Sequence, residues 1–132
     1  MTFINRMSNA GNRYQTNTMR VLCLGGAGLL RSPTTANVLH QDYGYNTRAA
    51  GVYEEYALIF VDRVLIEWAD QIVCVEPSVR DRLLGLYHYD EHALAKIQKS
   101  LVVLNVPGIY KWGDEHLKAV IREQYSEAAE EN

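Results

Sequence analysis

Cysteine is scarce in this sequence, and long apolar runs are missing. The 132 residues include two cysteines, Cys23 and Cys74. Both lie inside apolar runs, VLCL and IVCV, which is typical of buried strand thiols and argues against a disulfide framework or a zinc-thiolate site. No uncharged run approaches the roughly 20 residues that a membrane-spanning helix needs, and the N-terminus lacks the apolar segment of a signal peptide. We therefore expect a cytoplasmic protein that does not contact membranes.

A surplus of positive charge is also missing. The sequence has 13 lysine and arginine residues against 16 acidic residues, a formal net charge of −3. This balance gives no strong signal for a nucleic-acid partner. The four histidines have no metal-ligand spacing with one another or with the cysteines, so we expect no metal ion. Nothing in the sequence indicates a cofactor.

What is present is an ordinary globular composition, 48% hydrophobic and 22% charged. This length predicts one domain. Residues 1–18 are polar and without clear period, which indicates an N-terminal arm outside the core. Residues 19–132 are expected to form a single α/β domain.

Apolar strands alternate with amphipathic helices along residues 19–132. The expected strands are 20–24, 47–50, 71–75 and 101–104. Such alternation predicts a three-layer sandwich, with a four-stranded parallel sheet covered by helices on both faces.

Four helices are expected between and after the strands. The first is predicted to begin with Ser32 as its cap and Pro33 as its first residue, and to end at Gly44. Its inner face should carry Ala36, Leu39 and Tyr43. The others are marked by Val61, Val64, Leu65 and Trp68; by Val79, Leu83 and Leu86; and by Leu117, Val120, Ile121 and Tyr125. The acidic residues 127–132 are expected to fray.

The loop after the first strand is the clearest candidate site. Its glycines allow a tight turn of inward-facing N–H groups, the helix start adds positive potential, and Arg31 adds a planar fork of donors. Together these features favour a cradle for a phosphoryl group; a plain glycine-rich turn with a surface arginine is equally compatible with the pattern. The candidate phosphate-binding residues are Gly25, Gly26, Ala27, Gly28, Leu29, Leu30, Arg31 and Ser32.

The segment VLCLGGAGLLRSP (21–33) resembles the phosphate loop of low-molecular-weight protein tyrosine phosphatases, which reads Cys-x5-Arg-Ser-Pro after an apolar strand. The segments LIEWADQIV (65–73) and VRDRL (79–83) resemble a bacterial branch of that family. The segment VLNVPGIY (103–110) stands where this branch has its acid loop, and the likeness extends over about residues 19–121. The resemblance implies the family's fold, and its activity would be that of a protein tyrosine phosphatase.

Two departures from the family pattern concern the reacting groups themselves. Counting back from Arg31 places Gly25 where the family has its nucleophilic cysteine, and Gly108 and Ile109 stand where an acidic general acid is expected. Without a nucleophile and an acid, such a site can hold a phosphoryl group but cannot readily cleave its ester. We therefore expect a pseudophosphatase with no catalytic residue, which binds a phosphorylated protein, a phosphorylated small molecule or another anion.

Two alternatives remain open. Cys23, two residues before Gly25, could act as an unusual nucleophile in an active phosphatase. Alternatively, the fold could be a pure interaction module, in which the arm at residues 1–18 or an aromatic surface binds a partner protein or a second copy of the chain.

Aromatic residues are predicted to line the rim of the cleft. Tyr53 and Tyr56 follow the second strand, and Tyr110 and Trp112 lie on the segment that corresponds to the acid loop. Such a rim beside a cationic floor would suit an aryl phosphate or a nucleotide, although half-buried packing is an equally good interpretation.

Overall fold

A computed structural model describes residues 18–28, 30–110 and 114–131. Four parallel strands form one sheet in the order β2-β1-β3-β4. The strands are β1 (Arg20–Gly25), β2 (Asn46–Gly51), β3 (Gln71–Cys74) and β4 (Leu101–Val103). The α/β class and the four parallel strands predicted from the sequence are confirmed.

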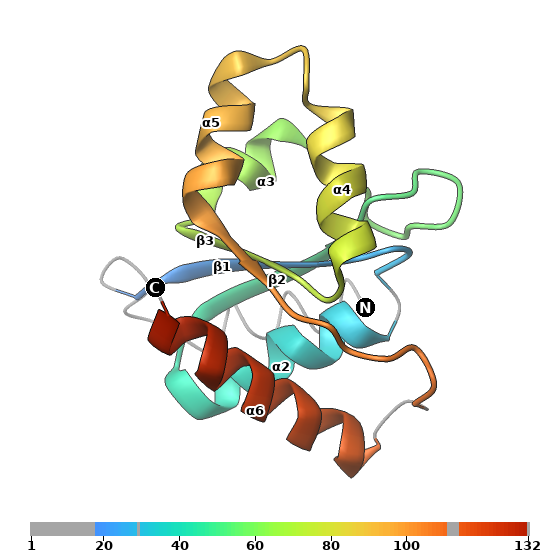
Figure 1. The fold of residues 1–132 in the computed structure, drawn as a ribbon, viewed down its shortest axis with the longest axis vertical. Coiled ribbons are helices and arrows are strands. Elements are labelled where there is room, and N and C mark those ends of the chain that lie inside the picture. Colours follow the sequence, from blue (N-terminus) through green and yellow to red (C-terminus); the bar gives the residue numbers. More distant parts are fainter. Residues whose placement is uncertain (1–17, 29, 111–113, 132) are drawn as a thin grey trace.

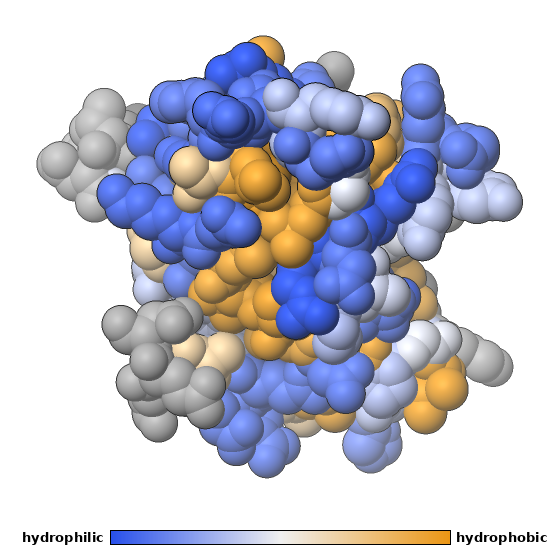
Figure 2. All heavy atoms as spheres, turned by 45° about the horizontal axis from the view of Figure 1, so that its top comes forward, coloured by the Kyte–Doolittle hydropathy of each residue, from blue (hydrophilic) through white to orange (hydrophobic). Residues whose placement is uncertain are grey.

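Helices cover both faces of the sheet (Figure 1). One face carries α2 (Arg31–Tyr43) and α6 (Glu115–Glu131), and the other carries α3 (Arg63–Trp68), α4 (Pro77–Leu86) and α5 (Glu91–Ser100). Figure 2 shows apolar atoms gathered across the middle of one face of the molecule, bordered by polar side chains. None of the helices in the described ranges is long and apolar enough to cross a membrane.

The central strand β1 explains why the sheet needs two covering layers. Val21, Leu22, Cys23 and Leu24 are all fully buried. Side chains alternate along a strand, so Val21 and Cys23 join the core beneath α2 and α6, whereas Leu22 and Leu24 join the core on the opposite face. A continuous apolar run therefore marks a strand that is buried on both sides.

The start of α2 differs from the sequence-based prediction. The helix begins at Arg31 with Leu30 in the cap position, and no side chain caps it. Ser32 is instead the second helical residue, and its Oγ donates to the Ala50 carbonyl at 3.4 Å. Pro33 still lies in the first turn, where a backbone N–H has no helical partner. The predicted end is correct, since Gly44 closes the helix in the left-handed region at φ 71°.

The helix α5 was missed by the sequence pattern. Its signals are present, because Asp90 accepts from the N–H of Ala93 at 3.1 Å and Ala93 and Ile97 are buried one turn apart. The helix follows α4 so closely that residues 87–90 gave no obvious break.

Three further details of the helices were wrong. Tyr43 and Val64 were expected on inner faces but are 46% and 73% exposed. The acidic end does not fray from residue 127, because α6 continues to Glu131. Most of the predicted arm, residues 1–17, lies outside the described residues.

Candidate anion-binding site

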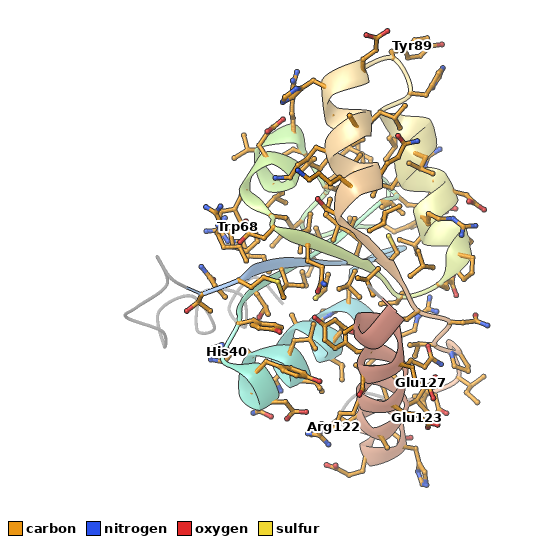
Figure 3. The ribbon with its side chains drawn as sticks, turned by 60° about the vertical axis from the view of Figure 1, so that its left-hand side comes forward. His40, Trp68, Tyr89, Arg122, Glu123 and Glu127 are labelled. Atoms are coloured by element: carbon orange, nitrogen blue, oxygen red, sulfur yellow. The ribbon has the colours of Figure 1, made fainter. Side chains whose placement is uncertain are left out.

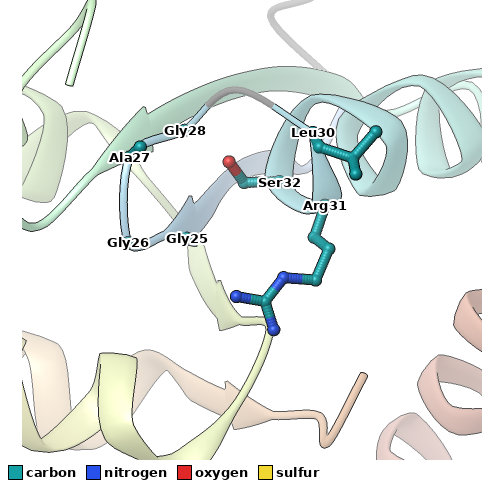
Figure 4. Close-up of a pocket in the computed structure, with 7 residues that line it drawn as sticks. All are labelled: Gly25, Gly26, Ala27, Gly28, Leu30, Arg31 and Ser32. Atoms are coloured by element: carbon teal, nitrogen blue, oxygen red, sulfur yellow. The ribbon is translucent and has the colours of Figure 1, made fainter. Parts of the chain in front are cut away.

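The loop between β1 and α2 curls around a small pocket at the carboxyl end of the sheet (Figure 4). The cavity is about 160 Å³, which is large enough for a phosphoryl group. Seven of the eight residues predicted for this loop line it, and Leu29 lies outside the described residues. The lining residues are Gly25, Gly26, Ala27, Gly28, Leu30, Arg31 and Ser32.

Two glycines let the loop lie directly against the end of β2. Gly28 has φ 73°, and a Cβ there would come within 2.8 Å of the Ala50 carbonyl carbon. A Cβ on Gly51 would come within 2.6 Å of the Ala27 carbonyl carbon. Any side chain at either position would force the loop away from the strand. Glycine is therefore required at both positions, because the backbone of the loop and the backbone of β2 lie so close together.

Backbone hydrogen bonds fix which way the peptide groups of the loop face. The N–H of Val52 donates to the Gly25 carbonyl at 3.0 Å, and the N–H of Tyr53 donates to the Gly26 carbonyl at 3.0 Å. In a planar trans peptide the carbonyl and the following N–H point in opposite directions. The N–H groups of Gly26 and Ala27 therefore face away from the segment after β2.

Arg31 is held at the open side of the loop by one of its terminal nitrogens. Nη1 donates to Glu76 Oε2 at 2.6 Å and to the Val106 carbonyl at 2.8 Å. Within the described residues, Nε and Nη2 have no hydrogen-bond partner. The remaining edge of the guanidinium is thus a fixed pair of donors, the geometry that suits two oxygens of one phosphoryl group.

Glu76 follows β3 and fixes this arginine. The hydrogen bond from Arg31 holds the pKa of the Glu76 carboxyl below its ordinary value, with a further contribution from the Ser78 hydroxyl, which donates to Oε1 at 2.6 Å. The sequence pattern did not single out Glu76. Its place after a buried strand, at the edge where parallel strands bind ligands, was the signal that could have revealed it.

No thiol faces the pocket among the described residues. A Cβ built on Gly25 would lie 3.2 Å from Ser32 Oγ, so this position points at the hydroxyl that Figure 4 shows inside the curve of the loop. Cys23 is instead fully buried beneath α2, and burial raises the pKa of its thiol. Cys74 is buried on the opposite face of the sheet, where burial raises its pKa to about 12.

The segment that corresponds to the acid loop lies over Arg31 without contributing a carboxylate. A Cβ on Gly108 would lie 3.7 Å from Arg31 Cζ, and the Ile109 side chain is 80% exposed. Asp114, a conceivable substitute acid, instead accepts from the N–H of His116 at 2.7 Å at the start of α6. No group of three or more histidine, cysteine or acidic side chains that could hold a metal is found in the described part of the chain.

The four residues predicted for the aromatic rim differ in their surroundings. The ring of Tyr53 would contact a Cβ on Gly26 at 3.5 Å, and Tyr56 lies beside it with a ring-centroid distance of 6.5 Å. Tyr110 packs against the core beneath α2 and α6. Trp112 lies outside the described residues. Tyr53 is therefore the rim residue with direct contact to the loop.

Solved structures of several phosphatases have a similar fold. Wzb of Vibrio vulnificus in complex with benzylphosphonate superposes with a TM-score of 0.64 at 15% identity, covering 88% of this chain and 100% of that one. A low-molecular-weight protein tyrosine phosphatase of T. tengcongensis gives a TM-score of 0.59 at 17% identity, covering 85% and 96% of the two chains. The YwlE arginine phosphatase of Geobacillus stearothermophilus gives 0.57 at 15% identity, covering 84% and 88%.

The chain has the fold of low-molecular-weight protein tyrosine phosphatases. No protein-family model matches the sequence, and a search of curated proteins gives no significant match. At 15–17% identity the likeness concerns the fold. A shared fold does not determine function, which depends on the residues of the pocket itself.

Proposed function

We propose that this protein is a pseudophosphatase, which binds a phosphoryl or similar anionic group in the β1–α2 loop without hydrolysing it. The observation that carries the proposal is the anchored Arg31. Its Nη1 is held by Glu76 and Val106, and its remaining donors lie beside a phosphoryl-sized pocket with a glycine at position 25.

The means of binding and the means of cleavage are separable in this site. Loop N–H groups, the start of α2 and a guanidinium edge stabilise an anion electrostatically. Cleavage of a phosphate ester by a covalent route needs an atom to attack phosphorus and a proton donor for the leaving oxygen. Gly25 offers no such atom, and Gly108 and Ile109 offer no acid.

The alternative of Cys23 as nucleophile is disfavoured by its surroundings. Its thiol is fully buried in the core beneath α2 and its pKa is raised. A protonated thiol without access to the pocket is a poor nucleophile. A pure interaction module remains the other alternative, and under that alternative Arg31 would be dispensable for every binding event.

The decisive experiment is titration of methylphosphonate into the wild-type protein and an Arg31→Ala variant. We expect about a ten- to hundred-fold loss of affinity in the variant, because hydrogen bonds to a charged group are removed. The matched control is Arg122→Ala, which removes an arginine from α6 on the outer face, where it pairs with Asp42 at 2.8 Å (Figure 3). That control should bind like the wild type.

Hydrolysis of p-nitrophenyl phosphate at high protein concentration tests the second half of the proposal. We expect no turnover by the wild type or by Cys23→Ser. Turnover that disappears in Cys23→Ser would establish the active-phosphatase alternative. Equal methylphosphonate affinity in wild type and Arg31→Ala would overturn the anion-binding proposal. The cytoplasmic location and the phosphorylated partner remain predictions.

A further inference from the structure

Arg82 is an exposed cation on α4, next to the segment that follows β2. Its Nε donates to the Val52 carbonyl at 3.3 Å, and its guanidinium lies over the ring of Tyr53, with Cζ 5.0 Å from the ring centroid. These two contacts fix the side chain without neutralising it, because a carbonyl and an aromatic face carry no net charge.

The other arginines differ from Arg82 in how their charge is balanced. Of the seven arginines in the described ranges, five pair with a carboxylate: Arg20, Arg31, Arg63, Arg80 and Arg122. The remaining two stack on aromatic rings instead. Arg48 is half-buried against Trp68, so Arg82 is the exposed arginine of the described chain that has no acidic partner.

Tyr53 connects this cation to the phosphoryl pocket. Its N–H donates to the Gly26 carbonyl, and its ring lies 3.5 Å from the point where a Cβ on Gly26 would stand. Tyr53 is therefore bonded to the loop through its backbone and lies under the guanidinium of Arg82 with its ring. The helix that carries Arg82 is also the one that Glu76 precedes, so α4 positions both cations of this region.

The pocket is open at the edge where Tyr53 lies. A phosphoryl group held in the cavity of about 160 Å³ would leave the rest of its ligand next to Tyr53, whose N–H bonds to the Gly26 carbonyl of the loop. Glu54 and Glu55, which follow Tyr53, are exposed and disfavour a second negative group in their direction. The side of Tyr53 that faces Arg82 is the electrostatically favourable path.

We propose that Arg82 is the second anion-binding group of this site, and that the ligand carries two negative groups on one small molecule. The phosphoryl group enters the loop, and the second group reaches across Tyr53 to the guanidinium of Arg82. This inference rests on the proposed function, because it adds a second contact to the same ligand. A guanidinium that is already fixed loses little conformational freedom when it binds.

The test compares ω-phosphonoalkanoates of increasing chain length with alkylphosphonates of equal length, by calorimetric titration at low salt. For the wild type we expect one chain length at which the added carboxylate tightens binding about three- to five-fold. In Arg82→Gln that preference should vanish, so that the phosphonoalkanoate binds no more tightly than the alkylphosphonate of equal length. In Arg82→Lys, which keeps the charge but not the stacked fork, part of the preference should remain.

The matched control is Arg80→Gln, on the same helix, since Arg80 Nε already pairs with Asp81 at 2.9 Å. It should keep the full preference. Absence of any preference in the wild type, or its persistence in Arg82→Gln, would overturn the inference and leave the proposed function intact. Failure of the alkylphosphonate itself to bind would overturn the proposed function, and the inference with it. Because raised salt screens an exposed charge pair, the wild-type preference should also decline with salt, a readout that needs no variant.

Discussion

Positions 23 and 25 of β1 lie on the same face of the same strand, yet a side chain at one position is buried and a side chain at the other would face the loop. The Cys23 side chain is sealed into the core beneath α2 and α6. Two residues further on, the strand has reached the start of α2, and a Cβ at Gly25 would point at Ser32. The difference shows that access to the helix start, and not the presence of a cysteine on this strand, decides whether a thiol can be reactive.

The physical basis of the contrast is the charge that each position would meet. A buried thiol surrounded by apolar side chains has its pKa raised, as at Cys23. A thiol at a helix N-terminus beside an arginine has its pKa lowered. Under the proposed function, the cysteine of β1 is at an inert position, and glycine is at the position where a thiol would be activated.

The largest difference that we expect between the two positions is in alkylation rate, which can be measured on a cysteine introduced at position 25. In native Gly25→Cys at neutral pH, we expect iodoacetamide to modify the new thiol at least about 100-fold faster than Cys23. Peptide mapping by mass spectrometry identifies the modified site. Equal and slow modification of both thiols would mean that position 25 does not face the pocket.

The contact with Ser32 calls for a second variant in this experiment. The introduced Cβ would stand 3.2 Å from Ser32 Oγ, which is tight enough to require a small shift of the hydroxyl. Gly25→Cys combined with Ser32→Ala relieves that contact, and fast modification should persist there. A double variant, Cys23→Ala with Gly25→Cys, should be modified at the same fast rate.

Much of the fold could be predicted from the sequence, because it depends on local patterns. The four apolar strands, the turn at Gly44 and the loop that contains Arg31 all follow from residues close together in the chain. The start of α2 was misplaced because Ser32, a residue type that commonly caps helices, bonds instead to Ala50 on the neighbouring strand. A competing partner from β2 cannot be recognised from the local sequence.

The parts of the site that were missed involve residues far apart in the chain. Glu76 lies 45 residues from Arg31, and Arg82 lies 30 residues from Val52. No local spacing relates such pairs, since the sheet order brings them together. The surroundings of Tyr110 depend on such long-range packing too, because the local sequence does not show that it packs against the core beneath α2 and α6.

A smaller difference is expected in how far a hydroxyl at each position lowers the free energy of unfolding. Cys23→Ser buries a polar group among apolar neighbours, and we expect it to lower the free energy of unfolding by about 1–3 kcal/mol. Gly25→Ser places its hydroxyl beside the pocket, and we expect a change below about 1 kcal/mol. Urea unfolding followed by circular dichroism measures both, and a reversed order would contradict the assignment of the sealed and open positions.

The smallest expected effect concerns the ion pair between Arg31 and Glu76, which lies beside the open end of β1. Arg31 lowers the folded-state pKa of Glu76, so the stabilisation is fully present above the unfolded-state pKa of about 4.3 and is lost as the pH falls through the folded-state value. Glu76→Gln should therefore melt about 2–4 °C below the wild type at neutral pH, and the gap should close on acidification. Glu123→Gln, on the outer face of α6 (Figure 3), is the matched control and should melt like the wild type at every pH. A gap for Glu76→Gln that stays constant down to acidic pH would mean that the ionised carboxylate contributes nothing, and that Arg31 is positioned by the Val106 carbonyl alone.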